Sequence, residues 1–487
     1  MIPHTLHPRS LILTALLASI ATAQITPGNL VVTRVGDGTA ALSNASTAVF
    51  LDQYTTAGLP GGPTIAMPIA AAGANMAVTN SGSATSEGFL TQSVDGRYLI
   101  SVGYGTAPGT VSISGTTSVA VNRVVARTAL DGTIDSSTAL TDAYSGNTFR
   151  SASSVDGSQF WTSGTATAAN GPGVRYAASL GATTSTQLST TVINIRVVNI
   201  FAGQLYCSSA SGAFQGVSKV GTGLPVASGE TITLLPGFPT ATGPSSYDFF
   251  LADATTLYVA DDRTNGLGGI QKWTEMSGTW SLQYTLALAA NVGCRGVTGC
   301  VNDGITTLYA TTTNNNIIAV TDDMGPASVV STIVTGVANT AFRGIRFVRT
   351  PASITHSGTA CATSVGVPII GTSGGDPVTG NLSFAITASN TPFPSIVLFS
   401  LKVGAVSPIG FPVPGTPACV LIFVLPDVLA SAVADPMGNA SVALPIPARC
   451  ALGGTLIGAQ AVPLDFTLTG FSLPVGSSDA MQIVIGN

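Results

Sequence analysis

The stretch Ser93–Ile100 (SVDGRYLI) recurs as Ser154–Trp161 (SVDGSQFW), and the first four residues are identical in both copies. Asp-Gly favours the positive φ angles of a tight hairpin turn, and the apolar residues that follow begin a strand. Weaker copies of the pattern lie at Ala202–Tyr206, Asp253–Val259 and Asp303–Ala310. The chain is therefore expected to repeat a β-hairpin.

One apolar residue occupies the same place in each copy, and the copies follow at steps of roughly 45 to 60 residues, the length of a four-stranded propeller blade. These residues are Leu99, Phe160, Leu205, Leu257 and Leu308. The spacing predicts an all-β chain whose amino-terminal part is a β-propeller. The alternative is a pair of irregular β-sandwiches whose hairpins resemble one another by chance.

The two ends of the repeat region are expected to supply one further blade. Asn29–Gly36 (NLVVTRVG) and Ala48–Thr55 resemble the second and third strands of a blade, and Phe342–Val348 (FRGIRFV) resembles its missing first strand. Joining both ends removes the unpaired edges that an open sheet would expose. We therefore expect the first segment to pair with the last, at Val31 or Val32. This reading gives six blades, with seven as the alternative because the gap before the first repeat is long.

The composition changes after Arg349, where the repeat stops. Residues 350–361 (TPASITHSGTAC) have the composition of a linker. Residues 362–487 then contain short apolar runs separated by Gly, Pro and Asn turns, a length and spacing that suit a compact β-sandwich. The predicted organisation is a propeller over residues 24–349, a linker over 350–361 and a sandwich over 362–487.

The amino terminus has the pattern of a secretory signal peptide over residues 1–23. Arg9 precedes a short apolar run, Leu11–Ile20, and the small-residue triplet Ala21-Thr22-Ala23 follows. Cleavage there would leave Gln24 as the first mature residue, in a protein that is secreted, periplasmic or attached to the cell surface. The best membrane-spanning candidate in the rest of the chain, Cys419–Leu425, is far too short to be a transmembrane segment.

Composition excludes several function classes. Charged residues make up 8% of the chain and the net charge is −5, without a basic stripe, so nucleic acid is a poor partner. His356 is the single histidine after residue 23, which excludes a multi-histidine metal site and leaves one route to a Ser-His-Asp triad. Because His356 lies in the linker, we expect no catalytic role for it. The glutamates Glu87, Glu230 and Glu275 are too few and too scattered for paired-glutamate glycosidase chemistry.

Six cysteines in an exported chain indicate disulfides. Cys294 and Cys300 are close enough in sequence to staple one loop, whereas Cys207 stands apart. Fifteen connectivities are open to six cysteines, and the sequence does not choose among them. The disulfide candidates are Cys294, Cys300, Cys361, Cys419 and Cys450.

Two parts of the chain resemble large exported bacterial proteins that have predicted propeller domains and a common carboxy-terminal module. The opening Ile25–Val32 (ITPGNLVV) with Arg34–Gly38 (RVGDG) carries the first resemblance. The second rests on Gly358–Cys361, Ala418–Leu421, Asp435 with Gly438, Pro445–Pro447, Gln460, Asp465 and Ser478–Ile485. The resemblance implies a propeller, a sandwich and a Cys361–Cys419 pairing, to which this chain adds Cys450. It implies no activity and no functional residue.

Ser154–Trp161 also resembles the Asp-box of sialidases, S-x-D-x-G-x-T-W, with the glycine one place early. Asp-boxes form structural turns, so the motif is interpreted as a blade hairpin. The acidic pairs Asp261-Asp262 and Asp322-Asp323 each follow an expected strand, and carboxylates are ligands that Ca²⁺ prefers. They are weak candidates for a Ca²⁺ site, and a solvated loop is the favoured alternative. No other cofactor is expected.

Two classes of function remain open. The first is an extracellular or cell-surface binding or structural protein that presents a rigid propeller face to a protein or glycan. The second is an extracellular Ca²⁺-assisted hydrolase or lyase that uses aspartates of the propeller loops. We favour the first over an enzyme because candidate bases and nucleophile pairs are so scarce in this chain. The fold alone does not decide between them, since propellers host many activities.

Overall fold

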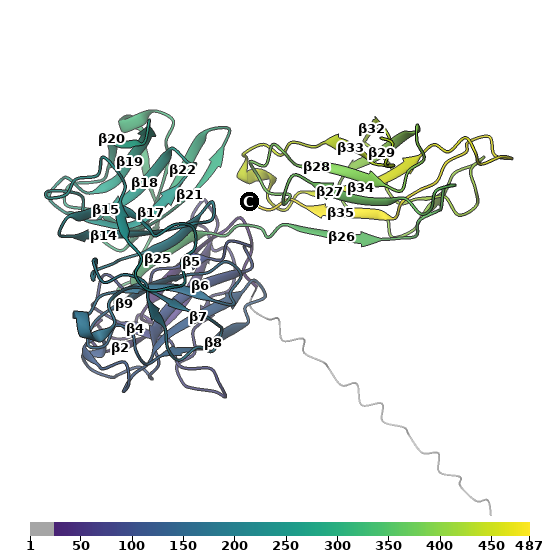
Figure 1. The fold of residues 1–487 in the computed structure, drawn as a ribbon. Coiled ribbons are helices and arrows are strands. Elements are labelled where there is room, and N and C mark those ends of the chain that lie inside the picture. Colours follow the sequence, from purple (N-terminus) through teal and green to yellow (C-terminus); the bar gives the residue numbers. More distant parts are fainter. Residues whose placement is uncertain (1–23) are drawn as a thin grey trace, which may run out of the picture.

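The computed structural model describes residues 24–487, and this part of the chain is nearly all β, built from many small antiparallel sheets (Figure 1). The predicted signal peptide lies outside the described residues. Within them the helical segments are short 3-10 turns: η1 (Ile113–Gly115), η2 (Ala168–Asn170), η3 (Gly325–Ala327) and η4 (Cys450–Leu452). No helix in residues 24–487 is both long and apolar enough to span a membrane.

Four sheets of the amino-terminal region each contain four consecutive antiparallel strands. The first sheet contains β9 (Phe149–Ser153), β10 (Phe160–Gly164), β11 (Gly173–Ala177) and β12 (Thr186–Gln187). The second contains β13 (Val198–Phe201), β14 (Gln204–Ser211), β15 (Phe214–Val220) and β16 (Ile232–Leu234). The third contains β17 (Ser246–Leu251), β18 (Thr256–Asp261), β19 (Gly269–Met276) and β20 (Thr279–Ala287). The fourth contains β21 (Cys294–Asn302), β22 (Ile305–Thr312), β23 (Asn316–Thr321) and β24 (Val330–Thr335).

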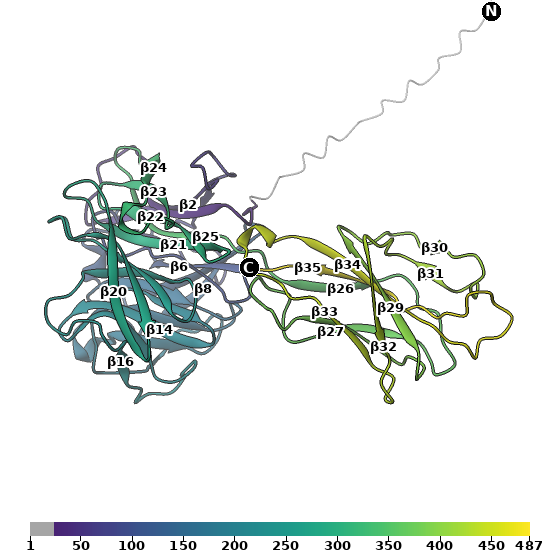
Figure 2. The same ribbon diagram turned by 90° about the horizontal axis from the view of Figure 1, so that it is seen from above.

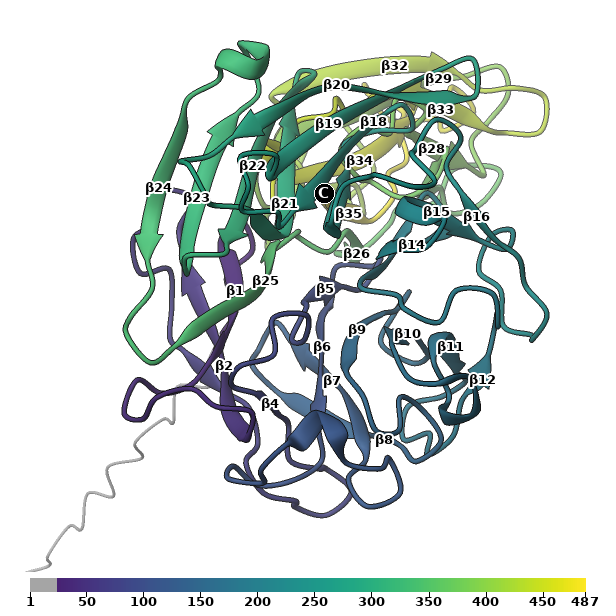
Figure 3. The same ribbon diagram turned by 90° about the vertical axis from the view of Figure 1, so that its left-hand side faces the viewer.

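A larger sheet contains the first strands of the chain together with a strand from the far end of the region. Its order is β25 (Ala341–Phe347), β1 (Leu30–Val35), β2 (Ser46–Tyr54), β4 (Thr79–Ser81), β6 (Tyr98–Tyr104), β7 (Arg123–Ala129) and β8 (Ile134–Leu140). Off this path, β3 (Ile65–Ala66) pairs with β2, and β5 (Thr91–Gln92) pairs with β6. Figure 3 shows the sheets arranged around a common centre.

The equivalence of the five repeated apolar residues is confirmed. Each lies on the second strand of its hairpin unit, and each is fully buried, because that strand packs between neighbouring sheets. Leu99 is on β6, and the others follow on β10, β14, β18 and β22. The turns that precede the first two have Gly96 at φ 75° and Gly157 at φ 78°, the positive φ angles that glycine adopts without strain.

The pairing of the two ends of the amino-terminal region is also confirmed. β1 lies between β25 and β2 and is antiparallel to both, with Val31 opposite Arg346 and Val32 opposite Ile345. Leu30, Val31, Val32 and Val35 are fully buried in this position. Neither long side of β1 is therefore a free edge.

The carboxy-terminal region contains a five-stranded sheet and a three-stranded sheet that share one hydrophobic core, which includes Phe384, Phe399 and Ile483 (Figures 1 and 2). The first is β26 (Ser353–Ser357), β35 (Ala480–Val484), β34 (Leu456–Pro463), β29 (Ile396–Val403) and β32 (Val428–Val433). The second is β27 (Ile369–Ser373), β28 (Ala385–Ser389) and β33 (Ala440–Ala443), and β30 (Phe411–Pro412) pairs separately with β31 (Leu421–Ile422).

The expected linker over residues 350–361 is too long. Ser353–Ser357 forms β26, which pairs along its whole length with β35 at the edge of the five-stranded sheet. An edge strand needs a partner on one side alone, so a mostly polar segment can join a sheet. Ile354 is the one apolar residue of β26, which explains why the composition resembled a linker. The connection that remains is residues 350–352.

Candidate functional site

The centre of the amino-terminal region is formed by the strands β5, β9, β13, β17, β21 and β25, which we call the inner strands. Figure 3 labels β5, β9, β21 and β25 around this centre. Neighbouring inner strands run in the same direction. The Phe89 amide, just before β5, donates to the Arg150 carbonyl of β9, and two residues later Thr91 donates to Ala152. The same holds from β5 to β25, where Gly88 contacts Gly344 and Gln92 contacts Arg349. All amino ends therefore lie at one mouth of the centre and all carboxyl ends at the other.

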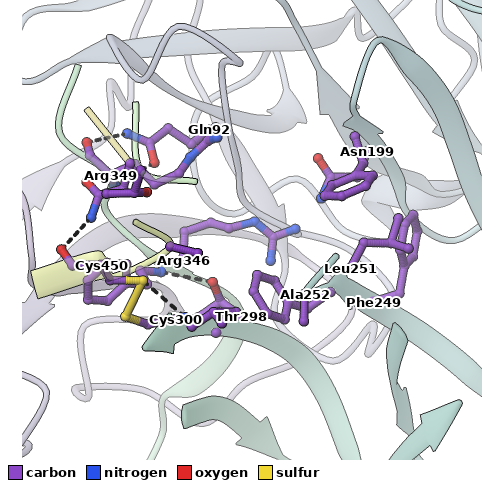
Figure 4. A pocket seen from close by; sticks show the side chains of 18 of the residues that line it. Gln92, Asn199, Phe249, Leu251, Ala252, Thr298, Cys300, Arg346, Arg349 and Cys450 are labelled. Carbon is purple, nitrogen blue, oxygen red and sulfur yellow. Dashed lines mark hydrogen bonds between the residues drawn. A yellow bond between two sulfur atoms is a disulfide. The ribbon is translucent and has the colours of Figure 1, made fainter. Parts of the chain in front are cut away.

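The mouth at the carboxyl ends contains a cavity of about 290 Å³, which we call the junction pocket (Figure 4). Its wall comes from both regions of the chain, with Thr379, Ala448, Cys450 and Asn487 contributed by the carboxy-terminal region. The amino-terminal region supplies both polar and aromatic side chains to the lining, including Gln92, Asn199, Phe249, Arg346 and Arg349. The carboxy-terminal region therefore covers this mouth.

The guanidinium groups of the junction pocket already have partners. Arg346 donates to both carboxylate oxygens of Asp248, at 2.7 and 3.1 Å, and Asp248 is fully buried. Arg349 donates to the Ser93 carbonyl at 2.9 Å, and burial, together with the neighbouring Arg346 charge, lowers its pKa. These contacts join β17 to β25 and fix the wall, and they leave few polar groups free for a ligand.

A disulfide between Cys300 and Cys450 closes the junction pocket on one side, and a second links Cys361 to Cys419 (Figure 4). The expected Cys294–Cys300 staple is wrong. Both residues lie on β21, and six residues of extended strand span roughly 20 Å, far beyond disulfide reach. Cys294 and Cys207 are free and buried, and burial raises the pKa of both thiols. The resemblance-derived Cys361–Cys419 pairing agrees with the structure.

The acidic pairs proposed as Ca²⁺ ligands are not brought together. Asp261 is buried and ion-paired with Arg263, and Asp322 is buried and accepts hydrogen bonds from the Tyr258 and Tyr284 hydroxyls. Lys272 also contacts Asp322 at 2.8 Å. Asp262 lies between two arginines, and Asp323 is exposed. Nowhere in residues 24–487 do three His, Cys, Asp or Glu side chains gather as a metal site.

The two remaining candidates from the sequence, His356 and the Asp-box-like segment, make structural contacts. His356 lies on the exposed strand β26, and the one hydrogen bond of its ring within residues 24–487 is to Asp479, at 3.1 Å. No triad is assembled there. The Asp-box-like segment forms the hairpin between β9 and β10, where the Gly157 amide donates to the Ser154 hydroxyl. Its tryptophan, Trp161, is buried and donates to the Pro225 carbonyl.

No protein-family model matches the chain, and no curated protein matches it. Similar solved structures include the periplasmic gluconolactonase PpgL of Pseudomonas aeruginosa, at 15% identity and a TM-score of 0.36, over 84% of this chain and 100% of that one. AztD of Citrobacter koseri is similar at 10% identity and a TM-score of 0.28, over 92% of this chain and 99% of that one. Likenesses of this size do not assign a function.

The disulfide between the two regions leads to a prediction for limited proteolysis. Residues Ser357–Thr359 are exposed, so a broad-specificity protease should cut there while both regions stay folded. We expect the nicked protein to run as one band on a denaturing gel without reductant and as two bands after reduction, because Cys300–Cys450 still joins the pieces. A Cys450→Ser variant is the control, and its carboxy-terminal piece should separate without reductant. Separation of the wild-type pieces without reductant would contradict the pairing.

Proposed function

We propose that residues 24–349 form a six-bladed β-propeller, that a β-sandwich follows, and that the mature protein acts outside the cytoplasm as a binding protein. In this proposal the five hairpin units with equivalent apolar residues are five blades, and β25, β1 and β2 supply the composite sixth. The propeller presents one rigid face to an extracellular protein or glycan. Two disulfides agree with export, because disulfides persist in oxidising compartments.

The observation that carries the proposal is the unequal covering of the two mouths. The carboxyl-end mouth is lined partly by the carboxy-terminal region and is closed by Cys300–Cys450. The carboxy-terminal region contributes no such lining to the amino-end mouth among residues 24–487. Loops of the amino-terminal region surround this mouth, among them Gly82–Gly88 before β5 and Arg263–Gly268 between β18 and β19. Leu267 in that loop is 55% exposed. This open face is therefore the surface that we assign to binding.

The enzyme alternative gains no support from the carboxylates on which it depended. Asp261 and Asp322 each form an ion pair with a cationic side chain of the same protein, Arg263 and Lys272, at hydrogen-bond distance. A Ca²⁺ ion would have to displace these cations and gather oxygen ligands that now lie apart. We therefore propose binding alone.

Screening the mature protein, residues 24–487, on glycan and protein arrays tests the proposal, and two matched variants locate the binding surface. Leu267→Glu adds a charge at the open face. Met276→Glu adds the same charge at the hairpin between β19 and β20, where Met276 is 78% exposed. We expect a bound ligand whose affinity falls at least about tenfold in Leu267→Glu, or about 1.4 kcal/mol, and stays unchanged in Met276→Glu.

The proposal would be overturned by an array without any ligand. It would equally be overturned if neither variant changed the affinity for the ligand found, or if Met276→Glu alone reduced it. Circular dichroism of both variants should match that of the wild type, since both substitutions are on exposed side chains.

A further inference from the structure

Four arginines recur at the beginning of inner strands, in the segments FRS, IRV, CRG and FRG. They are Arg150 on β9, Arg196 just before β13, Arg295 on β21 and Arg343 on β25. Because all inner strands run in the same direction, these four side chains belong to the amino-end mouth. This mouth is the open one, opposite the junction pocket.

A shared carboxylate neighbour shows that two of the arginines converge. The Arg196 guanidinium lies 3.7 Å from the centre of the Tyr247 ring. Asp262 lies between two of the arginines, 3.9 Å from Arg196 and 3.8 Å from Arg295, too far for a direct hydrogen bond to either. The remaining carboxylate of this cluster, Glu87, is fully buried and accepts hydrogen bonds from the Tyr104 hydroxyl and the Ser81 amide. Four positive charges thus face two carboxylates.

Two of the guanidinium groups have unused hydrogen-bond donors in the protein interior. The Nε atoms of Arg295 and Arg343 are buried and have no acceptor among the described residues. Arg343 as a whole is 3% exposed, and the one hydrogen bond of its guanidinium group within residues 24–487 is from Nη2 to the Gly82 carbonyl, at 3.0 Å. A buried charged donor without an acceptor is costly. Two such donors at one mouth therefore call for an acceptor from outside the chain.

Mutual repulsion of the arginines supports the same picture. Burial, and the neighbouring Arg196 charge, lower the pKa of Arg150 to about 10. Burial, and the neighbouring Arg295 charge, lower the pKa of Arg343 to about 10 as well. Both groups remain charged at neutral pH, and each would be stabilised by an anion placed among them.

We propose that the amino-end mouth binds an oxyanion, a carboxylate, sulfate or phosphate group, between Arg196, Arg295 and Arg343. The planar fork of a guanidinium matches such groups with two parallel N–H···O bonds. Asp262 already lies near two of these guanidinium groups, Arg196 and Arg295, and therefore competes with the ligand for them. The inference rests on the proposed function in that it uses the same face, and it adds the chemical class of the group that is recognised.

Isothermal titration calorimetry of residues 24–487 at low ionic strength tests the site with four probes: sodium sulfate, sodium phosphate, sodium galacturonate and uncharged galactose. We expect at least one anion to bind and galactose not to bind. A preference for galacturonate would identify the group as the carboxylate of an acidic sugar, and a preference for sulfate or phosphate would identify a free or ester-linked inorganic anion.

Three variants distinguish this site from general attraction by positive charge. Arg295→Gln should weaken anion binding about ten- to hundredfold, since it removes a charge-assisted hydrogen bond. Arg97→Gln removes a charge from an exposed position and should change nothing. Asp262→Asn should tighten binding severalfold, because it removes the competing carboxylate, whereas a purely structural role for the arginines would give no tighter binding.

Absence of binding by all three anions, or equal losses in Arg295→Gln and Arg97→Gln, would overturn the inference. Tighter binding in Asp262→Asn is required as well, and its absence counts against the site. The outcome is separable from that of the array. An array ligand whose affinity is unaffected by Arg295→Gln leaves the binding function standing and removes the oxyanion site. Anion binding without an array ligand leaves the oxyanion site standing and removes the proposed binding function.

Discussion

Replacing Asp248 by asparagine should lower the free energy of unfolding of the protein by about 3–5 kcal/mol, the usual cost of leaving one partner of a buried ion pair without the other. Asp248 is fully buried, Arg346 is 7% exposed, and both carboxylate oxygens accept from its Nη atoms. Asparagine keeps the shape of the side chain and removes the charge. The Arg346 guanidinium would then remain buried between β17 and β25 without its counterion.

Urea denaturation of residues 24–487, followed by intrinsic fluorescence, measures this loss. Asp253→Asn is the matched control, because Asp253 is exposed and accepts hydrogen bonds from Thr255 within one turn. It should cost no more than about 1 kcal/mol. A double variant, Asp248→Leu with Arg346→Met, should recover much of the stability, since replacing both ions with apolar groups leaves no charge unpaired. Equal stability of Asp248→Asn and Asp253→Asn would contradict the role of the pair.

Deleting residues 24–40 should abolish cooperative folding of the amino-terminal region. The deletion removes β1 from between β25 and β2 and leaves both of those strands with an open edge. It also removes five fully buried apolar side chains, Ile25, Leu30, Val31, Val32 and Val35, each worth about 1.5–3 kcal/mol, against a total stability of about 5–15 kcal/mol for a typical domain. We expect a chain that aggregates, because unpaired strand edges pair with other molecules.

Size-exclusion chromatography and thermal unfolding compare the deletion with a milder variant. Val31→Ala keeps the backbone hydrogen bonds of β1 and should lose about 2 kcal/mol while the protein stays monomeric and folded. The contrast separates the contribution of strand pairing from that of the side chains. A deletion variant that stays monomeric and melts at the wild-type temperature would show that β1 does not close the structure.

The hairpins and the joining of the two ends could be predicted from the sequence because each depends on local chemistry. Asp95-Gly96 and Asp156-Gly157 specify turns on their own, and the apolar residue after each turn specifies a buried strand. β1 and β25 were recognisable since both read as strands and neither had a partner nearby in the sequence. Each of the two strands left one edge unpaired, and this was enough to predict that they pair with each other.

The arginine cluster and the disulfide between the regions were missed, and for a different reason. Arg150 and Arg343 are ordinary in their own segments. Arg150 becomes a neighbour of Arg196, and Arg343 a neighbour of Arg295, after the inner strands gather around one centre. A signal was present, since one arginine follows an apolar residue at the start of several repeats. Cys300 and Cys450 are separated by 150 residues, and the nearer Cys294 was the more obvious partner until both cysteines were placed on one extended strand.

The position of β25 also sets the order in which the molecule can be completed as it is synthesised. β1 is the first strand of its sheet to be synthesised, and β25 is the last. Until that strand arrives, β1 has β2 alone as a partner, and its outer edge stays open. Contacts between such distant segments form slowly. An incomplete chain that ends before Ala341 therefore cannot hide this edge, and only a chain translated beyond Phe347 is shielded from self-association.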